Sequence, residues 1–82
     1  MSSQLSSDAY AAFIDVMKEV RVERGITQAG IAAKLGKPQS FMSKSELKER
    51  RIDVIEFLEL ADAMGVDAVE LLRRVRARLS GG

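Results

Sequence analysis

Apolar residues recur along this chain at intervals of three and four, which is the spacing of one face of an α-helix. Phe13, Met17 and Val20 form the first such series. No stretch alternates apolar and polar residues for long enough to predict a strand. The pattern predicts helices over residues 8–24, 28–35, 38–47, 54–64 and 68–79. We therefore expect an all-α fold of five helices joined by short connections.

Short oxygen-bearing side chains and glycines mark where these helices begin and end. Residues that can accept hydrogen bonds from the first turn of a helix precede four of them: Ser7, Thr27, Asp53 and Asp67. Pro38 fits the first turn of the third helix, where its missing N–H group would have no partner. Glycines that can end a helix follow three of them: Gly25, Gly36 and Gly65. The pattern predicts one folded domain over residues 8–79, a flexible leader over residues 1–7 and a flexible tail over residues 80–82.

The composition limits the chemistry that the protein can perform. The 82 residues contain no cysteine and no histidine, which excludes disulfides and thiolate metal sites and removes the commonest general base. The sequence has no nucleophile–base pair, phosphate-binding loop or cofactor motif. We expect a protein that is not an enzyme and that uses no metal and no cofactor. The longest apolar run, residues 9–14, is too short for a membrane span or a secretory signal, so we expect a cytoplasmic protein.

Charge is distributed unevenly, although the formal net charge is only +1. Residues 37–51 carry five basic and two acidic side chains, whereas residues 52–72 carry six acidic and no basic ones. The acidic residues of the fourth predicted helix recur every three positions, so they drift around it and favour a solvated face over a metal site. A basic segment beside an acidic one can orient a polyanion without a high total charge.

Two short predicted helices meet at Gly36 within residues 27–46. Ala32 is small enough for the two helices to approach closely, and Ile31 and Met42 supply apolar contacts that fix their angle. Such a pair, joined by a short glycine turn, is the helix-turn-helix unit, whose second helix enters the DNA major groove.

Two longer stretches carry a family resemblance: RVERGITQAGIAAKLGKPQSFMSK, residues 21–44, and ERRIDVIEFLELADAMGVD, residues 49–67. They resemble the lambda-repressor/Cro-like helix-turn-helix family, also called the Xre family, and the resemblance spans residues 13–72. It implies a five-helix lambda-repressor-like DNA-binding domain, encoded by a bacterium or a phage, with its helix-turn-helix in the second and third helices. The implied function is a transcription regulator, such as a repressor, that binds a roughly palindromic double-stranded DNA operator as a homodimer.

The resemblance also implies roles for individual residues. The side chains that it places against base edges are Gln39, Ser40, Ser43 and Lys44. Those that it places near phosphates are Thr27, Gln28, Lys37, Arg50 and Arg51. The side-chain chemistry agrees, because a glutamine amide can pair with adenine through two hydrogen bonds and a lysine can contact guanine or phosphate.

Three residues depart from the family's usual pattern. Gly30 lies inside the second helix, Ser45 stands where a bulky apolar residue is usual, and Lys48 stands where glycine is usual. Serine at position 45 predicts an underfilled inner face of the third helix, or repacking of Phe41 and Leu47 around it, so we expect Ser45→Ile to raise the melting temperature. With the acidic fourth helix, Ser45 and Lys48 favour an alternative function. It is a protein-interaction module, antitoxin-like or an adaptor, that keeps the fold, binds a protein partner and has little or no affinity for DNA.

The fifth predicted helix carries more apolar residues than a monomer core requires. Leu72, Val75 and Leu79 follow one another at intervals of three and four, so they form a seam that can face a second copy of the chain. We expect these three residues to form the homodimer interface. The alternative is that Leu72 and Val75 close the core of the monomer.

Overall fold

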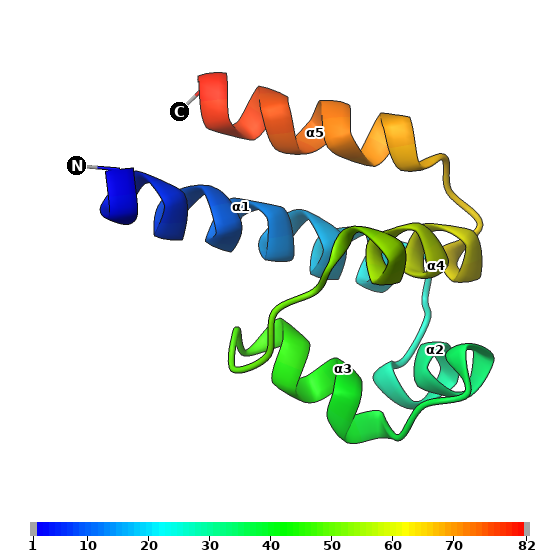
Figure 1. The fold of residues 1–82 in the computed structure, drawn as a ribbon. Coiled ribbons are helices and arrows are strands. Elements are labelled where there is room, and N and C mark those ends of the chain that lie inside the picture. Colours follow the sequence, from blue (N-terminus) through cyan, green and yellow to red (C-terminus); the bar gives the residue numbers. More distant parts are fainter. Residues whose placement is uncertain (1, 82) are drawn as a thin grey trace.

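The computed structural model describes residues 2–81, with side chains from residue 8 onward. Its helices are α1 (Ser2–Glu23), α2 (Gln28–Leu35), α3 (Gln39–Glu46), α4 (Val54–Met64) and α5 (Ala68–Gly81). No strand occurs within the described residues, so the predicted all-α fold of five helices is confirmed. Figure 1 shows α2 and α3 on one side of α1 and α4, and α5 running along the other side of α1.

The predicted bounds of α2 and α4 agree with the structure, whereas those of α1 and α5 do not. Helix α1 begins at Ser2, so Ser7 lies inside the helix and is not its N-cap. The residues before Asp8 include no proline or glycine, and serine and glutamine weaken a helix by only about 0.7 kcal/mol or less each. Helix α5 continues past Leu79 to Gly81, and the Ser80 hydroxyl donates to the Arg76 carbonyl at 3.0 Å. The predictions for Met1 and Gly82 fall on residues that the structure does not describe.

Capping interactions set the ends of the short helices. The Thr27 hydroxyl accepts a hydrogen bond from the Gly30 N–H group at 2.9 Å, and a Cβ atom on Gly30 would lie only 3.0 Å from the same oxygen. This close approach explains why glycine stands inside α2. Asp53 and Glu56 form a reciprocal capping box at the start of α4. Gly36 ends α2 with a φ of +68°, a conformation that only glycine adopts without strain.

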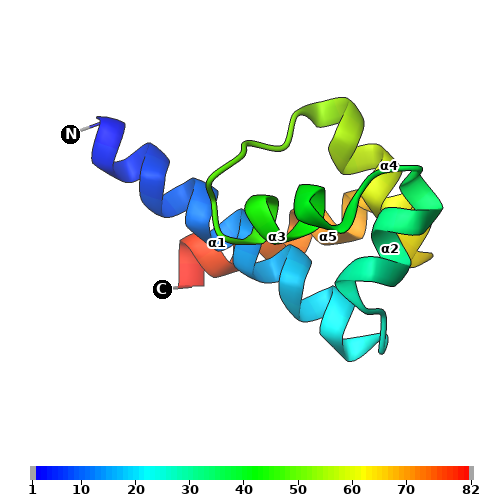
Figure 2. The same cartoon turned by 90° about the horizontal axis from the view of Figure 1, so that it is seen from below.

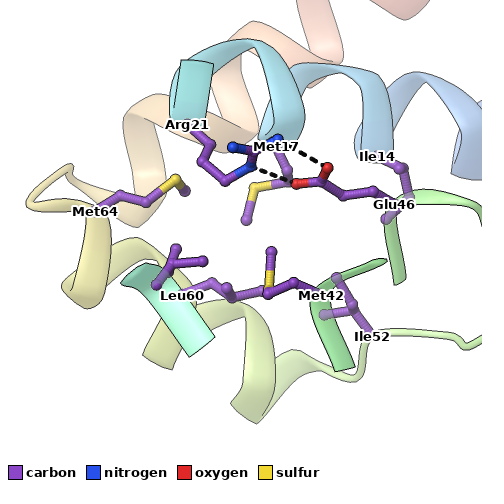
Figure 3. A pocket seen from close by; sticks show the side chains of 9 residues that line it. Ile14, Met17, Arg21, Met42, Glu46, Ile52, Leu60 and Met64 are labelled. Carbon is purple, nitrogen blue, oxygen red and sulfur yellow. Dashed lines mark hydrogen bonds and ion pairs between the residues drawn. The ribbon is translucent and has the colours of Figure 1, made fainter. Parts of the chain in front are cut away.

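The core lies where all five helices meet, and Phe41 and Met42 contribute the side chains of α3 to it. Three methionines, Met17, Met42 and Met64, line a small cavity at its centre, as Figure 3 shows. The cavity measures about 10 Å³, which is at most the space of one water molecule. This cavity is therefore too small to hold a ligand.

The inner face of α3 is filled, which contradicts the expectation for Ser45. The Ser45 side chain is completely buried and its hydroxyl donates to the Phe41 carbonyl at 2.6 Å. Ser45 does not line the core cavity, and Leu47 is 66% exposed, so Leu47 does not repack around it. A small residue at this position lets α3 lie close to its neighbours, so no larger side chain is missing.

We therefore expect Ser45→Ile to lower the melting temperature. Extra methylene groups in a filled core usually cost about 1–3 kcal/mol, and each kcal/mol corresponds to roughly 4–8 °C in a domain of this size. Thermal unfolding followed by circular dichroism measures the change. Ser45→Ala is the matched control and should be nearly neutral, because it removes only a hydroxyl that bonds to its own helix. A higher melting temperature for Ser45→Ile would restore the view that this face is underfilled.

Lys48 marks a strained turn after α3. It has a φ of +67° and is the only non-glycine residue with a positive φ in the described chain. The left-handed conformation costs a residue with a side chain about 1–2 kcal/mol. The Lys48 ammonium lies 3.8 Å from Asp15, but an exposed pair of this kind offsets only part of that cost. Lysine in place of the family's glycine is thus a local destabilisation that leaves the fold intact.

Candidate functional site

The exposed face of α3 gathers the four residues that were predicted to read base edges. Gln39, Ser40 and Lys44 are exposed and Ser43 is half-buried, while Phe41 and other residues of the opposite face are buried. Positions separated by three or four residues share one side of a helix, so these four side chains lie together. In Figure 2, α2, α3 and the loop that leads to α4 face the viewer, with α5 behind them. This polar face is therefore open to a partner.

A chain of polar contacts ties the first turn of α3 to the rest of the protein. Arg21 donates to both carboxylate oxygens of Glu46, at 2.6 and 3.0 Å, and to the Ile26 carbonyl at 2.7 Å. Figure 3 shows this pair at the edge of the core. Gln28 donates to Glu46 at 2.9 Å and accepts from the Gln39 amide at 3.4 Å. The side chains of Gln28 and Gln39, both singled out from the sequence, are thus oriented by a buried ion pair that the sequence reasoning missed.

Arg50 is engaged within the protein, which changes its predicted role. Its guanidinium donates to both carboxylate oxygens of Glu56 and to the Arg51 carbonyl, and it lies 4.5 Å from the centre of the Phe41 ring. The hydrogen bonds from Arg50 lower the pKa of Glu56 to about 2. The charge of Arg50 is therefore compensated by Glu56, and both terminal nitrogens of its guanidinium already donate hydrogen bonds. Arg50 holds the loop against α3 and α4 and does not present a free cation.

The remaining cations predicted to lie near phosphates are arranged differently. Arg51 is exposed and lies 4.3 Å from the centre of the Tyr10 ring, and Lys37 lies 5.1 Å from that of Phe41. Neither forms an ion pair with a carboxylate in the described part of the chain. Their positive charges are held by aromatic rings and remain uncompensated. Thr27, also predicted to lie near phosphates, uses its hydroxyl as the cap of α2.

The pairing of Glu56 with Arg50 predicts a loss of stability in acid. The pKa of Glu56 is lowered from 4.5 to about 2, so the unfolded chain binds a proton that the folded chain does not between these values. The contribution of Glu56 to the free energy of unfolding should be complete above pH 4.5. It should be lost as the pH drops toward 2. Urea titrations at several pH values measure this decline, and Glu56→Gln should make it shallower.

A matched control for that titration is Glu19→Gln. Glu19 also has a lowered pKa, caused mainly by its hydrogen bond from Arg78, but it is a surface carboxylate that does not touch the α3–α4 loop. If both substitutions flattened the acid decline equally, Glu56 would have no special place in it.

The three residues predicted for the dimer interface differ in how far they are exposed. Leu72 is 50% and Leu79 is 48% exposed, so both are available to a partner, whereas Val75 is only 8% exposed and belongs to the monomer core. Val75 packs in the monomer core at the edge of the groove described below, which favours the alternative that it closes the core of the monomer. Leu72 and Leu79 line an open groove with Val54 of α4 and Phe13 of α1. Tyr10 also lines this groove, although the sequence analysis did not single it out. It is the single tyrosine of the chain and lies just before the residues that carry the family resemblance.

Comparisons with known proteins agree with this architecture. A helix-turn-helix family model, HTH_3, matches residues 17–71. The chain belongs to the XRE-type helix-turn-helix family. The structure of an XRE-family like protein from Pseudomonas syringae pv. tomato str. DC3000 superimposes with a TM-score of 0.89 and 43% sequence identity, over 94% of each chain. The uncharacterized HTH-type transcriptional regulator y4dJ of Sinorhizobium fredii (strain NBRC 101917 / NGR234) is 42% identical over 53 residues, 65% of this chain and 69% of that protein.

Membership of the XRE family confirms several expectations. The protein is an HTH-type transcriptional regulator and not an enzyme. None of the described helices has the length and apolar character needed to cross a membrane. The family model covers residues 17–71, so it includes neither Tyr10 nor the groove residues of α5.

Proposed function

We propose that this XRE-type protein is a sequence-specific regulator that binds a roughly palindromic double-stranded DNA operator as a homodimer, in the cytoplasm of a bacterium or of a phage-infected cell. The observation that carries the proposal is the polar face of α3, where Gln39, Ser40, Ser43 and Lys44 lie together and face outward. An α-helix fits the major groove of B-form DNA, and these side chains offer the donors and acceptors that base edges require.

The proposed reading residues differ in what they can recognise. Gln39 carries a donor and an acceptor on one amide, which suits the two adjacent groups of adenine. Lys44 has no acceptor and suits guanine or a phosphate. Ser40 and Ser43 are short, so they allow the helix to approach the bases closely. The contact from Gln39 to Gln28 fixes the amide before DNA arrives, which reduces the conformational entropy lost on binding.

Phosphate contacts are proposed on both sides of this face. Thr27 and Gln28 lie at the N-terminus of α2, where free N–H groups favour an anion. Lys37 and Arg51 carry uncompensated charges that can neutralise phosphates. Arg50 is left out of the proposed phosphate contacts, because Glu56 already compensates its charge.

Two substitutions test reading and phosphate binding separately. Gln39→Ala should weaken the best site by about 1–3 kcal/mol and relax the preference at one base pair. Arg51→Ala should reduce the affinity for all DNA sequences alike. It should also make the slope of log affinity against log salt shallower by about one, the change expected for one phosphate contact. Fluorescence anisotropy on sequences selected from a random pool measures both effects. Arg50→Ala is the matched control, and its salt dependence should stay close to that of the parent.

Two results would contradict this function. If well-folded protein bound no DNA at low salt, the alternative of a protein-interaction module would replace it, as the internal pairing of Arg50 and the acidic α4 would then suggest. If Gln39→Ala kept the parent's sequence preference, α3 would not be the reading helix.

The homodimer is proposed from the exposed apolar residues of α5. One helix in one groove reads few base pairs, so proteins of this kind pair across two half-sites about one DNA turn apart. Leu72 and Leu79 remain half-exposed after the monomer has folded and lie on one side of α5. Contact with a second copy would remove both from water. Val75 takes no part in this proposed interface.

A further inference from the structure

Tyr10 makes two contacts with the loop between α3 and α4, although it lies far from that loop in the sequence. Its hydroxyl accepts a hydrogen bond from the Ile52 N–H group at 2.9 Å. Its ring lies under the guanidinium of Arg51, 4.3 Å from ring centre to the guanidinium carbon. One side chain of α1 thus fixes both the backbone of the loop and the position of its exposed arginine.

The stack on Tyr10 leaves the hydrogen-bonding groups of Arg51 available. A guanidinium is planar, and its five N–H donors point outward in that plane. A ring beneath the guanidinium attracts the cation without compensating its charge, and Arg51 donates no side-chain hydrogen bond within the described residues. Arg50, the neighbouring residue, is held in the opposite way, because its donors are taken by Glu56 and by a carbonyl. Of the two loop arginines, only Arg51 is therefore both held in place and free to meet a phosphate.

The support under Tyr10 reaches the core. The Phe13 ring lies 5.7 Å from the Tyr10 ring, and the Phe57 ring lies 5.6 Å from that of Phe13, with tilted and edge-to-face geometry. Both separations are in the favourable range for aromatic pairs. A row of three rings therefore connects Arg51, through the partly buried Phe13, to the buried Phe57 of α4. Tyr10 itself precedes residues 17–71, the part of the chain that matches the family model.

We propose that Tyr10 is a positioning residue for DNA binding, which holds the Arg51 guanidinium ready for a backbone phosphate beside the reading helix. The proposal rests on the proposed function, since Arg51 is assigned there to phosphate binding. The start of α1 then has a role in affinity, although none of its side chains is assigned a contact with DNA. Holding the arginine in advance reduces the side-chain entropy that phosphate binding removes.

A double-mutant cycle on one selected DNA site tests this role. The four proteins are the parent, Tyr10→Leu, Arg51→Ala and the double variant, each measured by fluorescence anisotropy over a range of salt. Losing a cation–π contact at an exposed site should weaken binding about two- to fivefold in Tyr10→Leu. In the Arg51→Ala background the same substitution should have no further effect. Tyr10→Leu should keep the parent's salt dependence, because Arg51 retains its charge.

Phe13→Leu is the matched control, since Phe13 contacts the Tyr10 ring but not Arg51. It should lower the melting temperature and weaken the affinity of the folded protein less than Tyr10→Leu does, because the direct contact of Tyr10 with Arg51 remains. Equal losses from Tyr10→Leu in both Arg51 backgrounds would overturn the proposal, because they would indicate a general structural effect. So would a loss of affinity in Phe13→Leu as large as that in Tyr10→Leu.

A measurement without DNA separates this inference from the proposed function. The NMR resonance of the Arg51 Nε–H group should be displaced by the Tyr10 ring in the parent and should return to its ordinary position in Tyr10→Leu. If the displacement were absent, the stacked geometry would be wrong and the inference would fail while DNA binding could stand. If the displacement were present but the parent bound no DNA, the proposed function would fail, and the positioning role would fail with it.

Discussion

Glu46→Ala should lower the free energy of unfolding by about 3–5 kcal/mol, a large share of the stability of a small domain. The substitution leaves the guanidinium of Arg21 buried without its carboxylate partner, since both side chains are about nine-tenths buried. It also removes the acceptor of the Gln28 amide. Urea denaturation followed by circular dichroism measures the loss, with stabilising salt or low temperature if the variant unfolds too easily.

The double substitution Arg21→Met with Glu46→Leu is the control that isolates the unpaired charge. Replacing a buried ion pair by apolar residues of similar volume is often neutral or stabilising, so the double variant should be more stable than Glu46→Ala alone. The reverse order would mean that Arg21 stabilises the fold without Glu46, for example through its hydrogen bond to the Ile26 carbonyl. A loss below about 1 kcal/mol for Glu46→Ala would mean that the pair behaves as an exposed one.

The same pair explains why Gln28 and Gln39 can be assigned from the sequence while their support cannot. The glutamines stand at the first positions of α2 and α3, whose starts are marked in the chain by Thr27 and Pro38. Arg21 and Glu46 are 25 residues apart, and nothing in the spacing of either one indicates that they meet. A contact of this kind depends on the angle between α1 and α3, which only the packed structure defines.

Ser45 and Val75 illustrate a second limit of sequence reasoning. The periodicity of apolar residues predicted which helices exist, but it could not predict how closely they approach. Ser45 was interpreted as a missing bulky residue, yet it is completely buried beside its own helix carbonyl. Val75 was assigned to the dimer interface, yet it is only 8% exposed and belongs to the core of the monomer. Both differences follow from the distance between helices, which depends on all the side chains at the contact.

Arg50 and Arg51 differ for a related reason. Adjacent arginines are equivalent in the sequence, and both were assigned to phosphates. In the folded chain one of them pairs with Glu56 at the start of α4 and the other stacks on Tyr10 of α1. Their partners in the fold, one close in the chain and one far from it, therefore decide which cation remains available to DNA.

Replacing Leu72 and Leu79 together by glutamate should convert the proposed homodimer into a folded monomer and reduce operator affinity about 100-fold or more. Each side chain is half-exposed in the monomer, so glutamate there keeps access to water and the core is spared. In a pair of copies, four carboxylates would be buried against one another without partners, which opposes association. Two half-sites would then be bound independently, and the gain in affinity from linking them would be lost. Analytical ultracentrifugation measures the mass, and anisotropy on a palindromic site measures the affinity.

Two further variants decide how that result is interpreted. Ala77→Glu adds an acidic side chain to an exposed position of α5 that does not line the groove, and it should leave both the mass and the affinity close to those of the parent. Val75→Glu places a carboxylate in the core and should unfold the protein, which circular dichroism would detect. An unchanged dimer mass for the Leu72 and Leu79 variant would place the interface on another surface. A parent that sediments as a monomer at tens of micromolar, yet binds the palindromic site tightly, would mean that DNA itself brings the two copies together.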